Sequence, residues 1–292
     1  MKRSIARLSL LAVLAVLLAL SLFMTGSAFA ITGNYVADYD HPFVGLVVIY
    51  GADGEFLWRG SGSLISPTVV LTAGHVVDAA EGAVSARVYF QQNAGANYDP
   101  LLQYDPVSGY PLYDSKDGMS RTSDELYNFG FSNFAGFPNT QDVGLIILDD
   151  PIDVGELGVL PTPGLLDSLA TKRGPQKPVF TVSGYGLTKA VQEHSALSDI
   201  SYRSRLMAES TLVSLNSHNT DGFNLQTQGN GDGRGGTLFG DSGGPVFLGG
   251  PDSNVIVGVT SFVMNSLGRG TNYAYRIDTQ DVLDWINGGY LN

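Results

Sequence analysis

One stretch of this sequence places a serine in a setting suited to nucleophilic chemistry: Gly240-Asp241-Ser242-Gly243-Gly244-Pro245. Glycines permit a tight turn and let a substrate carbonyl approach the backbone closely. Such a turn can expose the Ser242 hydroxyl and direct several backbone N–H groups toward one point, as in an activated serine beside an oxyanion hole. A serine alone is a weak nucleophile, so the stretch predicts a histidine base and an orienting carboxylate elsewhere in the chain.

Two other segments supply candidates for these partners. His75 follows the short apolar run Val69-Val70-Leu71, and Asp142 precedes the apolar run Leu145–Leu148. Each candidate therefore lies at the end of a predicted buried strand that can hold its side chain in place. The chain order His75, Asp142, Ser242 matches one of the known orders of the serine hydrolase triad.

The remaining histidines and acidic residues lack such a setting. His41, His194 and His218 are assigned to structure or surface, and no pair of histidines has the H-x-x-x-H spacing of a zinc site. Asp221 and Asp232 lie among Asn and Gly without the ligand spacing of a calcium loop, so we interpret them as turn residues. The sequence predicts no metal and no other cofactor.

Composition favours a β-rich protein with many turns. The 292 residues are 43% hydrophobic and include 37 glycines, and long Ala/Leu/Glu/Lys stretches are missing outside the N-terminus. The formal net charge is -12 and basic residues are scattered, so nucleic acid is not expected as a partner. There are no cysteines, which excludes disulfides and cysteine-ligated zinc but not export.

Residues 1–30 have the pattern of a signal peptide. Lys2, Arg3 and Arg7 precede a long apolar run that ends at Ala28-Phe29-Ala30, an A-x-A cleavage pattern. Cleavage after Ala30 predicts a secreted protein, without stable membrane association, that begins at Ile31. Because the apolar run is nearly long enough to cross a bilayer, an uncleaved anchor is the alternative.

The rest of the chain reads as short strands separated by turns. This rhythm is typical of a sandwich or barrel. Residues 93–140 show no sustained period and are predicted to be a long loop insertion with one or two strands, and residues 151–163 are a turn-rich connector. A short helix near the C-terminus is predicted after Asp278 or Thr279 as cap. The predicted strands are Phe43–Tyr50, Phe56–Arg59 leading into the run Gly60–Ser66, Val69–Leu71, Ala86–Gln91, Leu145–Leu148, Val179–Tyr185, Leu206–Leu215, Gly222–Gln228, Val246–Leu248, Val255–Phe262 and Tyr273–Ile277.

Three segments together resemble the trypsin/chymotrypsin-like serine proteases: Thr72-Ala73-Gly74-His75, Asp142-Val143-Gly144-Leu145 and Gly240–Pro245. The likeness covers nearly all of the chain from Ile31. It implies an all-β fold of two antiparallel six-stranded barrels with a short C-terminal helix. We expect the first barrel in residues 31–158 and the second, with the helix, in 159–292. Export without disulfides suggests a bacterial member.

The resemblance implies a role for each motif residue. Ser242 attacks the scissile carbonyl, His75 transfers the proton, and Asp142 fixes the histidine tautomer. Backbone N–H groups of Gly240 and Ser242 form the oxyanion hole. Ser261 supports Asp142, and Ser261-Phe262-Val263 pairs with the substrate backbone as an added strand.

The family also implies an activation pair. There, a new N-terminal Ile or Val amine pairs with the acid that precedes the nucleophile, and here these groups are Ile31 and Asp241. A desolvated pair of this kind holds the oxyanion loop in shape. Ile31-Thr32-Gly33-Asn34 departs modestly from the usual Ile-Val-Gly-Gly, and no basic activation site precedes it. We expect signal cleavage itself to create the activating terminus.

Specificity departs from that of trypsin. Gly236 stands six residues before Ser242, where a trypsin-type enzyme carries an aspartate, so cleavage after Lys or Arg is not expected. Val263 and Asn272 both narrow the predicted pocket. We therefore expect a monomeric endopeptidase that acts on protein or peptide substrates after a small or medium uncharged residue. The alternatives are a catalytically weak or inactive binding protein on the same fold and an esterase with the same triad.

Overall fold

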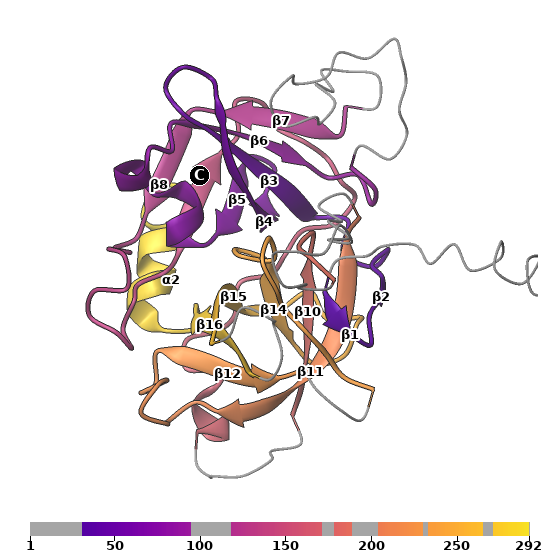
Figure 1. Ribbon diagram of the computed structural model, residues 1–292, viewed down its shortest axis with the longest axis vertical. Coiled ribbons are helices and arrows are strands. Elements are labelled where there is room, and N and C mark those ends of the chain that lie inside the picture. Colours follow the sequence, from indigo (N-terminus) through magenta and orange to yellow (C-terminus); the bar gives the residue numbers. More distant parts are fainter. Residues whose placement is uncertain are drawn as a thin grey trace, which may run out of the picture.

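The computed structural model describes residues 31–94, 118–170, 178–188, 204–229, 233–264 and 271–291. The predicted signal peptide, His194 and Asp232 lie outside these residues. Two barrels of antiparallel strands lie one against the other, the first in indigo to magenta and the second mainly in orange and yellow (Figure 1). The predicted all-β class with two barrels and one short C-terminal helix is confirmed.

The first barrel is a sheet that returns on itself. Its strands run in the order β7-β6-β3-β4-β5-β9-β8. Only Asp124 separates β7 from β8, and β7 pairs with β6 while β8 pairs with β9, so the two short strands together close the ring. The strands are β3 (Val44–Tyr50), β4 (Phe56–Ser66), β5 (Val69–Thr72), β6 (Ser85–Tyr89), β7 (Ser120–Ser123), β8 (Glu125–Asn128) and β9 (Gly144–Ile147).

The second barrel is a closed ring of six strands, because β10 pairs with both β14 and β11 in the order β10-β14-β15-β16-β12-β11. Two short segments near the start of the chain attach to it: β2 pairs with β11, and β1 pairs with β13. The strands are β10 (Val179–Gly184), β11 (Leu206–Ser214), β12 (Asn224–Gln228), β14 (Pro245–Leu248), β15 (Ile256–Val263) and β16 (Thr271–Arg276), with β1 (Thr32–Gly33), β2 (Val36–Ala37) and β13 (Gly235–Gly236).

Most predicted strands are found within one or two residues of their expected ends. The one or two strands predicted within 93–140 are found as β7 and β8 in residues 120–128, and both are part of the first barrel. The sequence of these strands, Ser-Arg-Thr-Ser-Asp-Glu-Leu-Tyr-Asn, contains few apolar residues. The strands are held by backbone pairing to β6 and β9, which needs no apolar pattern. Short 3₁₀ helices span Gly74–Val77, Ala79–Glu81 and Asp167–Leu169.

The C-terminal helix α2 (Gln280–Asn287) packs on the first barrel, although it follows the second barrel in the chain (Figure 1). Val282 and Ile286 are fully buried in the first barrel's core cluster, and Trp285 contacts Phe129 with ring centroids 5.2 Å apart. Val282, Leu283 and Ile286 form the buried face of this helix. Thr279 is the N-cap residue, but its side chain makes no capping hydrogen bond.

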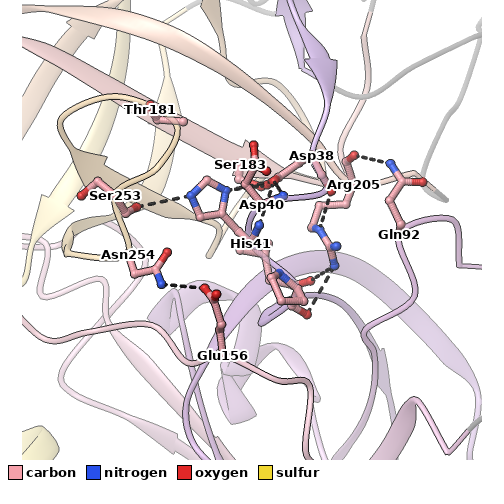
Figure 2. Close-up of polar contacts among 12 residues, drawn as sticks. Asp38, Asp40, His41, Gln92, Glu156, Thr181, Ser183, Arg205, Ser253 and Asn254 are labelled. Carbon is pink, nitrogen blue, oxygen red and sulfur yellow. Dashed lines mark hydrogen bonds and ion pairs between the residues drawn. The ribbon is translucent and has the colours of Figure 1, made fainter.

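A buried polar cluster joins the two barrels near the start of the chain (Figure 2). The Asp38 carboxylate contacts His41 Nδ1 at 2.9 and 3.0 Å and accepts hydrogen bonds from the His41 N–H and the Ser183 hydroxyl. His41 Nε2 lies 3.3 Å from the Ser253 carbonyl oxygen. Arg205, 3% exposed, donates to the carbonyls of Asp38, Val44 and Phe90. His41 is therefore structural, as predicted.

Candidate active site

Asp142 contacts both His75 and Ser261 in the candidate site. Its side chain is fully buried, two residues before β9. It accepts the His75 backbone N–H at 2.8 Å, lies 2.9 and 3.1 Å from His75 Nδ1, and accepts the Ser261 hydroxyl. These contacts bring together β5, β9 and β15, so both barrels contribute to the position of the His75 ring.

The negative charge of Asp142 and the positive charge of a protonated His75 stabilise each other. Burial alone would raise the pKa of Asp142, but the His75 charge and the hydrogen bonds from His75 and Ser261 outweigh it and lower that pKa. Burial alone would lower the pKa of His75, but the Asp142 charge and hydrogen bond, with a smaller effect of Asp78, raise it. The arrangement thus keeps Asp142 ionised and favours an imidazolium at His75.

Ser242 lies on a turn that depends on glycine. Gly240 and Gly243 have φ values of 93° and 83°, in the left-handed region that favours glycine. A Cβ at Gly243 would lie 2.0 Å from the Thr72 hydroxyl oxygen and 2.3 Å from the Ser61 carbonyl oxygen. The turn is therefore pressed against the first barrel, next to the strand that leads to His75.

The backbone of this turn leaves two N–H groups available. Among the described residues, the N–H groups of Gly240 and Ser242 donate to no protein acceptor, whereas the N–H groups of Asp241, Gly243 and Gly244 do. The Ser242 carbonyl accepts from the Ser61 N–H at 2.7 Å. Two free donors beside a serine hydroxyl match what an oxyanion hole requires.

Asp241 is fully buried, and its carboxylate accepts the N–H groups of Gly186 and Leu238, each at 2.8 Å. Burial raises its pKa to about 7, although these two hydrogen bonds oppose the shift. No ion pair of Asp241 is present in the described part of the uncleaved chain. Ile31 is fully buried in the core of the second barrel, and β1, which follows it, pairs with Gly235–Gly236. The Ile31–Asp241 pair stays a prediction.

Two cavities meet at His75 and Ser242. The larger, about 480 Å³, extends over Phe56, Trp58 and Glu81 on the first barrel. The smaller, about 250 Å³, lies on the second barrel. Of the five predicted substrate-binding residues, Ser261, Phe262 and Val263 line the smaller cavity, whereas Gly236 and Asn272 lie next to residues that line it. Its lining residues are His75, Phe134, Thr237, Leu238, Phe239, Ser242, Thr260, Ser261, Phe262 and Val263.

Three contributors were not identified from the sequence. The Ser61 hydroxyl donates to the Gly240 carbonyl at 2.9 Å and accepts the Tyr185 N–H at 3.0 Å. Phe134, from the segment before Asp142, packs edge-on against Phe262 at 5.6 Å between ring centroids. Thr237 lines the smaller cavity. Thr237 directly follows Gly236, which the sequence does place in the specificity pocket. Ser61 and Phe134 have no neighbours in the sequence that indicate their roles.

Within the described residues, no group of three or more His, Cys, Asp or Glu is placed to hold a metal ion. In the same residues, no helix has the length and apolar character needed to cross a bilayer.

Comparison with known proteins agrees with this geometry. The sequence model of the Trypsin family matches residues 31–286. Among solved structures, HL collagenase is similar with a TM-score of 0.59 and 20% identity over 88% of this chain and 98% of that chain. Human heparin binding protein is similar with a TM-score of 0.59 and 20% identity over 88% of this chain and 95% of that chain. A search of curated proteins gives no match.

Proposed function

This chain belongs to the trypsin family, and from that membership we propose that it is an exported serine endopeptidase that acts through His75, Asp142 and Ser242. One observation carries the proposal: the Asp142 carboxylate binds the backbone and ring of His75 and the Ser261 hydroxyl, while His75 and Ser242 line the same two cavities. A packed or surface histidine would not need this set of partners.

In the proposed reaction, Ser242 Oγ bonds to the scissile carbonyl carbon as His75 Nε2 takes the hydroxyl proton. The carbonyl oxygen becomes an oxyanion, which the N–H groups of Gly240 and Ser242 stabilise. Loss of one such donor typically costs about 3 kcal/mol of transition-state stabilisation. Asp142 stays ionised and stabilises the imidazolium, in line with its lowered pKa.

The carbon–nitrogen bond then breaks, and His75 gives its proton to the leaving amine. This leaves an ester between Ser242 and the acyl half of the substrate. A water molecule attacks the carbonyl carbon of that ester while His75 takes a proton from the water. Collapse of the second tetrahedral intermediate releases the acid product and returns the proton to Ser242 Oγ.

Export and activation form the second part of the proposal. Residues 1–30 act as a signal peptide, cleavage after Ala30 releases the protein, and the new Ile31 ammonium pairs with Asp241. The buried Asp241 carboxylate supports this step, because it has two N–H donors but no cation in the described part of the uncleaved chain. Family members are commonly secreted, and the absence of cysteine fits a bacterial exported protein.

The substrates are proteins or peptides cleaved after a small or medium uncharged residue. No Asp or Glu lines the smaller cavity, which supports the absence of specificity for Lys or Arg. We propose a monomer with no metal, no cofactor and no nucleic-acid partner.

A binding protein on this fold is the second candidate, because one solved neighbour is a heparin binding protein. The formal net charge of -12 opposes binding of a polyanion. An esterase with the same triad is the third candidate.

The test compares the secreted protein with Ser242→Ala. The proposal expects fluorophosphonate labelling and peptide hydrolysis in the wild type and neither in the variant. Hydrolysis of esters alone would identify an esterase, and a folded protein that is never labelled would identify a binder. Mass analysis of the same sample should find Ile31 at the N-terminus; any other start contradicts the activation step.

A further inference from the structure

Two buried threonines whose hydroxyls lack a hydrogen-bond partner line the smaller cavity, and a third unpaired polar atom lies on Asn272, next to a lining residue. Thr237 and Thr260 line the cavity and are 1% and 4% exposed, and in the described structure neither hydroxyl has a partner. Asn272, 4% exposed, has no partner for its Nδ2 atom. Native proteins satisfy most buried polar groups, and an unpaired one is destabilising. Three of them in or next to one cavity beside Ser242 therefore point to a ligand with polar atoms.

The Asn272 amide lies beside Gly236, at the edge of the smaller cavity. Asn272 pairs across the sheet with Val263, which lines the cavity. A Cβ at Gly236 would lie 2.5 Å from Asn272 Nδ2, so glycine at position 236 leaves room for the Asn272 amide. The Asn272 amide thus takes up the space beside Gly236, where trypsin-type enzymes carry an aspartate. The polar groups that remain are hydroxyls and an amide, not an acid.

The charges of the lining residues restrict the chemical class of the ligand further. The lining residues include no Lys, Arg, Asp or Glu, and His75, which is engaged by Asp142, is the one histidine among them. A carboxylate here would be buried without a cation, and an ammonium without an anion, and both arrangements are strongly unfavourable. A purely apolar side chain would leave all three polar groups unpaired. The best match is an uncharged side chain that both donates and accepts hydrogen bonds.

We infer that the smaller cavity binds a carboxamide, the side chain of glutamine or asparagine, on the acyl side of the scissile bond (the P1 residue). The carboxamide oxygen accepts from Asn272 Nδ2 and from a threonine hydroxyl, and its NH₂ donates to a threonine oxygen. This inference rests on the proposed peptidase activity. It makes Thr237, Thr260 and Asn272 specificity-determining residues within the broader class of uncharged P1 residues.

The first test uses the mature enzyme and peptides that differ only at P1, with Gln, Asn, Leu or Glu. We expect kcat/KM for the better carboxamide to exceed that for Leu by about tenfold or more, and Glu to be cleaved less well than Gln. Highest activity with Leu or with Glu overturns the carboxamide assignment while leaving the peptidase intact. Cleavage of none of the four, by protein that is folded, overturns the peptidase proposal and this inference together.

The second test removes single hydroxyls. Thr237→Val and Thr260→Val should each lower the Gln-to-Leu ratio of kcat/KM about tenfold, and Thr237→Ser, which keeps the hydroxyl, should restore it. Ser63→Ala is the control, since Ser63 is a buried serine of the first barrel whose hydroxyl also lacks a partner. A loss of stability alone would lower both rates and leave the ratio unchanged. An unchanged ratio in both valine variants, with fluorophosphonate labelling retained, contradicts the inference.

Discussion

The Ser61 hydroxyl donates to the Gly240 carbonyl across 2.9 Å and so connects the turn that carries Ser242 to β4 of the first barrel. The same oxygen accepts the Tyr185 N–H, and the Ser61 N–H donates to the Ser242 carbonyl. One small residue thus joins the first barrel to two segments of the second. The position of Ser242 relative to His75 depends on this junction, because the two residues belong to different barrels.

Removal of the Ser61 hydroxyl should therefore impair catalysis. Ser61→Ala loses the buried hydrogen bond to the Gly240 carbonyl, which holds the turn, and a second bond from the Tyr185 N–H. At a net value near 1 kcal/mol for each bond, we expect kcat to fall between about fivefold and about thirtyfold. KM should change little, because Ser61 is absent from the residues lining both cavities. Peptide kinetics measure both effects. Ser63→Ala, two residues along the same strand, is the matched control, and equal kcat in the two variants would contradict this positioning role.

The raised pKa of His75 should set the acid limb of the activity profile. The base must be neutral to accept the Ser242 proton, so kcat/KM should rise with pH through a value above the ordinary histidine pKa of about 6.5. Asp142→Asn removes the charge that raises this pKa. The variant should lose about 10⁴-fold in kcat. The acid limb of the pH profile of its remaining activity should move to lower pH. A limb that stays in place would show that Asp142 is not its cause.

Asp241 should make the uncleaved chain less stable as the pH rises from acid toward neutrality. Its folded-state pKa is raised from 3.8 to about 7, so the folded state holds this proton more tightly than the unfolded state. The stabilising effect is full below pH 3.8 and is lost as pH rises toward 7. We compare the unexported precursor, which keeps residues 1–30 and carries Ser242→Ala to prevent self-digestion, with the same protein carrying the added change Asp241→Asn. In urea unfolding, the stability of the first relative to the second should fall over that range. A constant difference between the two proteins would contradict the shift.

Asp38 should show the opposite pH dependence. Burial alone would raise its pKa, but hydrogen bonds and charge from His41, with contributions from Ser183 and Arg205, lower it. A lowered carboxyl pKa contributes stability above pH 3.8, and this contribution is lost as pH falls through the folded-state value. Asp38→Asn should cost about 3–5 kcal/mol at neutral pH, since it removes the buried negative charge near the buried Arg205 guanidinium, and less in acid.

Denaturant midpoints across pH measure this effect. Asp40→Asn is the control, because Asp40 is exposed two residues away, and its effect should stay within about 0.5 kcal/mol. Equal midpoints for the two variants at neutral pH would show that the Asp38 cluster does not hold the barrels together.

The sequence was most informative where a residue's role needs specific neighbours along the chain. Ser242 needs glycines on either side, and the short segments around His75 and Asp142 carry their roles in the same way. Ser61 stands in an ordinary Gly-Ser-Gly-Ser run, and its role depends on Gly240, 179 positions away. The Asp38 cluster likewise depends on Ser183 and Arg205, 145 and 167 positions away. Such contacts leave no periodic pattern.

The packing of α2 on the first barrel sets the order in which the chain can finish folding. Val282 and Ile286 complete a core whose other members come largely from residues 43–152. That barrel therefore remains open on one side until the final residues of the chain have been made. A piece cut off after the first barrel should expose this apolar surface and aggregate, and the two halves should unfold together rather than as separate domains.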